Sequence, residues 1–178
     1  MGKRAVFLDR DGTIAPDVGY CSRTEDFSVF PGAGEAVRLL NRAGFLAVVI
    51  TNQSGIARGY FSEDTLADIH REMVGQLAAQ GGRIDAIYYC PHHPDDGCQC
   101  RKPGTGLLQR AAEEMDIDLS RSFMVGDLQI DIDAGRAAGC RTVLVTTGPH
   151  AGSDITDPPD HTATSLLEAA RWIVETAG

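Results

Sequence analysis

Acidic side chains cluster at two places in the sequence, each directly after a short apolar run. Asp9 and Asp11 follow the first apolar run, and Asp127 and Asp131 follow a later one. Residues i and i+2 of an extended backbone face the same side, so we expect Asp9 and Asp11 to converge. Neighbouring carboxylates repel one another unless they share a proton or hold a cation between them. Because Mg²⁺ prefers oxygen ligands, the pattern predicts a magnesium site.

A second pattern of metal ligands lies between residues 90 and 100. The segment contains three cysteines and two histidines, and three thiols with one imidazole at this spacing are typical of tetrahedral Zn²⁺. The expected ligands are Cys90, His92, Cys98 and Cys100. Four protein ligands make a closed, structural site, so we predict that zinc orders this loop and the residues beside it. On spacing alone, His93 could replace His92.

Five apolar runs, separated by amphipathic segments, must position these side chains. Continuous apolar runs are typical of strands covered on both faces of a parallel sheet. The predicted strands span 5–8, 46–50, 86–89, 123–125 and 142–145. Helical periodicity predicts helices around 36–43, 66–77, 107–115, 134–138 and 166–174, the second with Ser62 as its N-cap. This alternation predicts a doubly wound, three-layer α/β fold of Rossmann type.

The whole chain, residues 1–178, is expected to form one domain with a zinc loop at 90–100, since no linker or repeat divides it. Open α/β sheets bind ligands beyond the carboxyl ends of their strands. We therefore expect the site in the segments that follow the strands, namely 9–13, 51–59, 90–102 and 126–131. The Gly- and Pro-rich stretch 148–159 is expected to be a surface loop.

The composition excludes several classes of function. Formal net charge is -9, which argues against nucleic-acid binding and against an anionic membrane surface. No apolar run is long enough to cross a membrane and no signal-peptide pattern is present, so we expect a cytoplasmic protein, and we take a monomer as the starting hypothesis. Cys21 and Cys140 stand alone in the sequence and are expected to be free, packed thiols.

The order of these motifs resembles that of the haloacid dehalogenase-like phosphohydrolases over nearly the whole chain. Asp9 to Thr13 matches the opening motif of that family, followed by Thr51, by Lys102 before a helix, and by Asp127 with a second acidic residue. The resemblance implies that Asp9 is a nucleophile that forms an aspartyl-phosphate, and that Asp11 is the general acid and base. It also implies Mg²⁺ held by the Asp9 carboxylate, the Asp11 backbone carbonyl and Asp127, and only a minimal cap over the site.

A carboxylate approaches a phosphate dianion only where cations screen the repulsion. The Thr51 hydroxyl, the Asn52 backbone N–H and the Lys102 ammonium are expected to hold the oxygens of the transferred phosphoryl group. Together with Asp9 and Asp11, these residues form the predicted catalytic set.

Within the family, the zinc loop and the segments 17–20, 51–59 and 87–94 resemble members that hydrolyse a heptose 1,7-bisphosphate, a small sugar phosphate, at C7. That resemblance implies a role in nucleotide-heptose synthesis for lipopolysaccharide core or surface glycans. The alternative within the same chemistry is histidinol phosphate, and a non-catalytic, zinc-stabilised binding module is a third hypothesis. Two features depart from the heptose pattern: Leu128 occupies a position where some members have Lys, and the zinc loop is short.

A bisphosphate needs a second anion-binding group, and Arg101 is the strongest candidate because a guanidinium binds phosphate through two hydrogen bonds. Arg58 is a weaker candidate. The candidates for contacts to sugar hydroxyls are Asp17, Tyr20, Gln53 and Ser54. Phe61 and Trp172 are expected to pack in the core, and the histidines without a partner are expected at the surface: His70, His150 and His161.

Overall fold

The protein contains one six-stranded sheet in which all neighbouring strands are parallel, seen in a computed structural model that describes residues 1–178. The strands are β1 (Arg4–Leu8), β2 (Phe45–Asn52), β3 (Ala86–Cys90), β4 (Phe123–Gly126), β5 (Arg141–Val145) and β6 (His161–Ala163). Their order in the sheet is β3-β2-β1-β4-β5-β6. The five predicted strands are confirmed. The sixth was not predicted, because His161-Thr162-Ala163 contains no apolar run.

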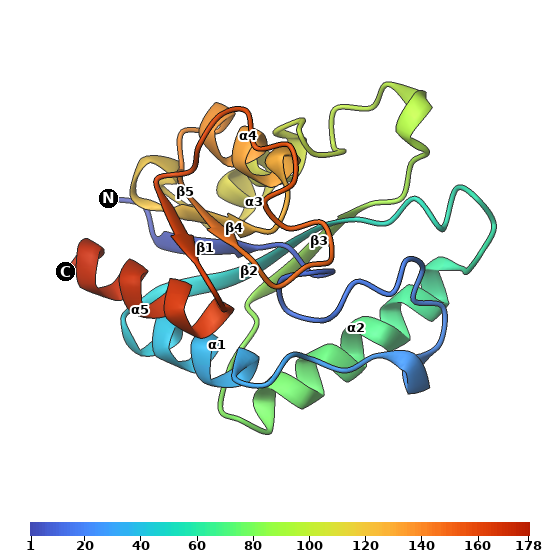
Figure 1. Ribbon diagram of the computed structural model, residues 1–178, viewed down its shortest axis with the longest axis horizontal. Coiled ribbons are helices and arrows are strands. Elements are labelled where there is room, and N and C mark those ends of the chain that lie inside the picture. The colour runs from blue at the N-terminus through green and yellow to red at the C-terminus, as the bar shows by residue number, and fades with distance from the viewer.

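Five helices cover the two faces of the sheet and complete the predicted three layers (Figure 1). They are α1 (Ala33–Arg42), α2 (Glu63–Ala78), α3 (Gly106–Met115), α4 (Gln129–Ala137) and α5 (Leu166–Ala177), with short 3-10 turns at Thr24–Asp26, Pro94–Asp96 and Leu119–Arg121. Helices α1, α2 and α5 lie on one face, and α3 and α4 on the other. None of these helices is long and apolar enough to span a membrane.

Two helix starts show how local sequence sets the boundaries. The Ser62 side chain accepts a hydrogen bond from the Thr65 N–H and caps α2 as predicted. Helix α4 begins at Gln129, five residues earlier than the predicted range, because the Asp131 carboxylate accepts from the Leu128 N–H and caps its first turn. That polar turn has no apolar periodicity from which to predict it.

The core lies on both faces of the sheet and is divided by the strands into two apolar clusters. Phe61 is buried and Trp172 packs against the larger cluster, as expected. Two expectations about histidines were wrong: His70 is buried, and the His161 ring stacks on Trp172 with a centroid distance of 4.4 Å. At the amino ends of the strands, the Arg4 guanidinium donates to the carbonyls of Ala43 and Ala177.

Strands β1 and β4 are neighbours although more than a hundred residues separate them in the chain. From β1 the sheet grows in one direction through β2 and β3, and from β4 it grows in the other. Connections therefore diverge beyond the carboxyl ends of these two strands and leave a crevice there. Asp9 follows β1 and Asp127 follows β4, so the topology brings the two acidic segments to one place.

Candidate active site

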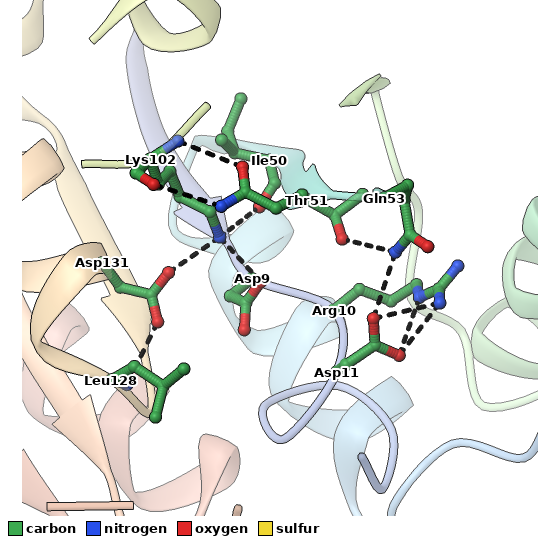
Figure 2. Close-up of polar contacts among 10 residues, drawn as sticks. Asp9, Arg10, Asp11, Ile50, Thr51, Gln53, Lys102, Leu128 and Asp131 are labelled. Atoms are coloured by element: carbon green, nitrogen blue, oxygen red, sulfur yellow. Dashed lines mark hydrogen bonds and ion pairs between the residues drawn. The ribbon is translucent and has the colours of Figure 1, made fainter. Parts of the chain in front are cut away.

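A buried lysine joins the two acidic segments (Figure 2). Lys102 Nζ donates to Asp9 Oδ1 and to Asp131 Oδ1, both at 2.7 Å, and to the Ile50 carbonyl at 2.9 Å. Only 2% of the Lys102 side chain is exposed. Lys102 thus lies at the carboxyl ends of the strands, in the segment where the site was predicted. Its ion pairs with Asp9 and Asp131 were not predicted.

The charges in this cluster are not balanced, since one ammonium faces the carboxylates of Asp9, Asp127 and Asp131. Burial and the negative charge of Asp131 raise the pKa of Asp9 well above its usual range. Burial by itself would lower the pKa of Lys102, but the charges of Asp131 and Asp9 outweigh it and raise that pKa. The lysine therefore stays charged, and the carboxylates still have an excess of negative charge.

The Asp127 carboxylate is packed against backbone and lacks a hydrogen-bond partner at Oδ1. Burial, with the charge of Asp131, raises the pKa of Asp127 to about 6. A Cβ at either Gly12 or Gly148 would collide with this carboxylate, so glycine is required on both sides of it. Oxygens of Asp9, Asp127 and Asp131 lie within 4.8 Å of one another. Excess negative charge, a free buried oxygen and this spacing together fit a divalent cation.

The Asp11 side chain does not converge with Asp9, so that expectation was wrong. Its carboxylate instead accepts from Arg10 Nε at 3.1 Å, from Arg10 Nη2 at 3.0 Å and from Gln53 Nε2 at 3.1 Å (Figure 2). The chain turns at Gly12, whose φ is +86°, so the regular alternation of a strand does not continue through Asp11. Arg10, which was not predicted as a site residue, donates the hydrogen bonds that hold the Asp11 carboxylate in this position.

The segment after β2 is tied to Lys102 through a pair of reciprocal hydrogen bonds. Asn52 Nδ2 donates to the Lys102 carbonyl at 3.2 Å, and the Lys102 N–H donates to Asn52 Oδ1 at 3.1 Å. The Thr51 hydroxyl is buried and accepts from Gln53 Nε2 at 2.9 Å. The Asn52 side chain is thus occupied in positioning Lys102, which leaves its backbone as the group able to meet a phosphoryl oxygen.

A cavity of about 300 Å³ opens over these groups. It is lined by thirteen residues: Asp9, Asp11, Asp17, Gly19, Tyr20, Asn52, Gln53, Ser54, Arg101, Lys102, Leu128, Ile130 and Asp131. Ten of them are predicted site residues, with Asp131 of the acidic cluster among them. Thr51 and Asp127 lie beneath the lining, and Arg58 lies outside it, with its guanidinium 5.9 Å from the centroid of the Tyr20 ring. Leu128 and Ile130 lie in the predicted segment 126–131, but their apolar side chains gave no individual indication that they line the cavity.

Arg101 lines the cavity, and its Nη1 is buried without a hydrogen-bond partner. A guanidinium N–H removed from water and left unpaired is costly, so the position favours an anionic ligand that would satisfy it. This agrees with the expectation for Arg101 from the sequence.

The predicted zinc ligands are brought together at the end of β3. Cys90 Sγ lies 3.0 Å from Cys100 Sγ, 3.5 Å from Cys98 Sγ and 3.5 Å from His92 Nδ1. His93 faces away from these thiols, because its Nδ1 accepts from the Asp95 N–H at 3.2 Å. The structure therefore favours His92 over His93 as the fourth zinc ligand, a distinction that the spacing alone could not make. Cys21 and Cys140 are buried and free.

Comparisons with known proteins agree with this geometry. A family model described as HAD-hydrolase-like matches residues 99–169. The chain is 42% identical to a D-glycero-beta-D-manno-heptose-1,7-bisphosphate 7-phosphatase of Haemophilus ducreyi, covering 97% of this chain and all of that protein. A Vibrio cholerae protein of the same name is 44% identical, over 96% and 94% of the two chains. The crystal structure of D,D-heptose 1,7-bisphosphate phosphatase from B. bronchiseptica, complexed with magnesium and phosphate, superimposes with a TM-score of 0.91 at 37% identity and covers 97% of this chain and 99% of that one.

Proposed function

This chain belongs to the heptose-1,7-bisphosphate 7-phosphatases of the haloacid dehalogenase-like hydrolases, and we propose that it removes the C7 phosphate of D-glycero-D-manno-heptose 1,7-bisphosphate. One observation carries the proposal beyond the resemblance. The same cavity contains the Asp9–Lys102 cluster, suited to one phosphate, and an unpartnered buried guanidinium nitrogen of Arg101, suited to a second. Histidinol phosphate has one phosphate and an amine, so it would leave Arg101 unpaired. The relatives reported above are named as heptose-bisphosphate phosphatases, which also argues against histidinol phosphate as the substrate.

In the proposed reaction, an Asp9 carboxylate oxygen attacks phosphorus and the bond from phosphorus to the C7 oxygen breaks. Asp11 gives its proton to that oxygen, and the sugar leaves as an alcohol. Asp11 then takes a proton from the water that attacks the aspartyl-phosphate and releases inorganic phosphate. Lys102, the Thr51 hydroxyl and the Asn52 backbone N–H hold the phosphoryl oxygens throughout.

The carboxylates of Asp9 and Asp127, with the Asp11 backbone carbonyl, would hold Mg²⁺. When bound, the ion screens the repulsion between the Asp9 carboxylate and the phosphate. The excess negative charge of the cluster and the unpaired oxygen of Asp127 support this assignment. A relative of known structure contains magnesium and phosphate together.

Zn²⁺ is proposed as the ion of the second cluster, because three thiolates and an imidazole with tetrahedral spacing suit it best. Its ligands are Cys90, His92, Cys98 and Cys100, and its role is structural. This loop leads directly into Arg101 and Lys102, so ordering it also orders the groups proposed to bind both phosphates. We propose that this loop belongs to a single domain formed by residues 1–178.

Asp17, Tyr20, Gln53 and Ser54 line the cavity and are proposed to contact the sugar hydroxyls. Because Arg58 lies over the Tyr20 ring and outside the lining, its proposed contribution is to hold Tyr20 in place.

The experiment is a steady-state comparison of both anomers of the heptose bisphosphate, histidinol phosphate and a simple phosphate ester. We expect the highest kcat/KM for the heptose bisphosphate, with the β anomer preferred as in the names of the Haemophilus and Vibrio relatives. Arg101→Gln should raise KM for the bisphosphate about tenfold or more and leave the simple ester within about twofold, since one charged hydrogen bond is worth about 1.5–3 kcal/mol. A preference for histidinol phosphate would overturn the assignment.

A further inference from the structure

A buried guanidinium lies between the proposed general acid and helix α2. Arg10 is only 1% exposed, and its only carboxylate partner is Asp11. Its Nε and Nη2 donate to that carboxylate, while its Nη1 lies 3.2 Å from Nε2 of His70. Its charge also lies 5.7 Å from the centroid of the Phe27 ring. Arg10 is therefore held from two sides, by the catalytic loop and by α2.

His70 must be the acceptor in this contact, because a guanidinium only donates hydrogen bonds. Burial, with the charge of Arg10, lowers the pKa of His70 to about 3, so the ring is neutral at neutral pH. The Tyr89 ring is its aromatic neighbour, with centroids 6.3 Å apart. A neutral, buried imidazole with one nitrogen bonded to Arg10 is well suited to fix the position of that guanidinium.

The position of Asp11 poses a chemical problem. In the proposed reaction this carboxyl group must meet the leaving oxygen near Asp9, yet the structure holds it against Arg10 and Gln53. To meet that oxygen the carboxyl group would have to break its hydrogen bonds to Arg10, and it would form them again at the end of each turnover. A buried guanidinium that loses its one carboxylate partner is costly and would follow the carboxylate or shift unless another group retains it.

We propose that His70 is a positioning residue for acid–base catalysis, retaining Arg10 so that Asp11 leaves and returns along one defined path. This inference rests on the proposed function. Its balance of atoms is that of the reaction above: the proton moves from Asp11 to the C7 oxygen as the bond from phosphorus breaks, and returns to Asp11 from the attacking water. His70 itself exchanges no proton and touches no reacting atom.

The test separates substrates by their need for a proton on the leaving group. A sugar alkoxide needs one, whereas p-nitrophenolate is a stable anion and does not. Rapid-quench measurements would give the rate of phosphoenzyme formation with the heptose bisphosphate and with p-nitrophenyl phosphate. We expect His70→Leu to slow the sugar reaction about tenfold, the loss typical of one hydrogen bond to a charged group, and the aryl reaction less than about twofold.

His70→Gln retains an acceptor for Arg10 and should restore the sugar reaction to within about threefold of the wild type. His70→Phe fills the space without an acceptor and repeats the test if the leucine variant does not fold. Met73→Ala, at a buried position of the same helix, is the control for lost stability and should not separate the two substrates.

Equal slowing of both esters in the leucine or phenylalanine variant, or unchanged rates in both, would overturn the role of His70. A wild-type protein that forms no phosphoenzyme with either ester would instead overturn the proposed function. The two failures are therefore distinguishable.

Discussion

The two clusters of potential metal ligands are built in opposite ways. The carboxylate cluster is buried and joins two segments far apart in the chain, with Asp9 from one and Asp127 and Asp131 from the other. The cysteine–histidine cluster comes from a single loop of eleven residues, and its ligands apart from Cys90 are partly exposed. The ends of β1 and β4 position Asp9 and Asp127 in the first cluster, whereas the second reaches the core only through Cys90, Cys98 and Cys100.

This difference predicts a catalytic role for the proposed magnesium and a structural role for the proposed zinc. The proposed magnesium meets a site whose geometry is already fixed, so its loss should stop chemistry and leave the fold intact. The proposed zinc would contribute folding free energy to its own loop, since the loop after β3 is partly exposed and contains no regular element apart from the turn Pro94–Asp96. Removing it should disturb Arg101 and Lys102, which follow directly.

The largest effect is expected at the preassembled cluster. Asp9→Asn removes the nucleophile and should lower kcat at least about 10⁴-fold. The thermal unfolding midpoint should stay the same or rise, because the variant relieves repulsion among buried carboxylates. Steady-state kinetics and circular dichroism would measure both, with the exposed Asp64→Asn as a control that changes neither. Retained turnover would remove Asp9 as the nucleophile.

Lys102→Met should affect activity and stability together. The lost ammonium leaves Asp9 and Asp131 without their buried partner, which typically costs about 3–5 kcal/mol of unfolding free energy. We expect kcat to fall about 10²–10³-fold as well, as for other lost electrostatic contacts to a transition state. Adding Asp131→Asn should restore part of the stability and none of the activity. Urea unfolding of the single and double variants would show no such recovery if the charge balance is unimportant.

Removing each ion in turn should distinguish the roles of the two clusters in catalysis and in folding. Omitting Mg²⁺ from the buffer should abolish turnover and adding it back should restore turnover, with unchanged circular dichroism. Cys98→Ser should lower zinc affinity by at least about 10–100-fold, the loss already typical of disturbing a metal's outer partners, and should weaken activity through Arg101 and Lys102. Metal analysis with activity assays would test this. Full activity in a zinc-free protein would show that the loop needs no ion.

The smallest effect is expected at His93. Its Nδ1 caps the turn Pro94–Asp96 and does not face the thiols. His93→Ala should therefore change zinc content and kcat/KM by less than about twofold, as is usual for a partly exposed residue outside the ligand set. His92→Ala is the matched variant and should lose zinc. The reverse result would exchange the roles of the two histidines.

The sequence predicted those parts of the molecule that depend on local pattern. Continuous apolar runs identified five of the six strands of the sheet, and ligand spacing identified the cysteine–histidine loop. The rule for parallel sheets then placed Asp9, Lys102 and Asp127 at one edge, where the structure has them.

What the sequence did not predict depends on contacts between distant segments. Asp11 was expected beside Asp9, but Arg10 and Gln53 hold it elsewhere, and Gln53 comes from the end of another strand. His70 was expected at the surface because no partner for it lies nearby in the chain. Its partner, Arg10, is sixty residues away. A side chain whose environment is set by a distant residue has no local signal.

The contacts of Arg4 indicate that this chain could be circularly permuted. Its guanidinium donates to the Ala177 carbonyl at 2.9 Å, so the first strand and the last helix meet at the amino ends of the strands, and Figure 1 shows both chain ends on the same side of the molecule. Residues at the two ends of the chain are thus close enough for a short linker to join them. New ends opened between the exposed residues Ser153 and Asp154 would give a circular permutant with every strand neighbour unchanged. The order of the elements along the chain would change, while the catalytic edge of the sheet would stay as it is.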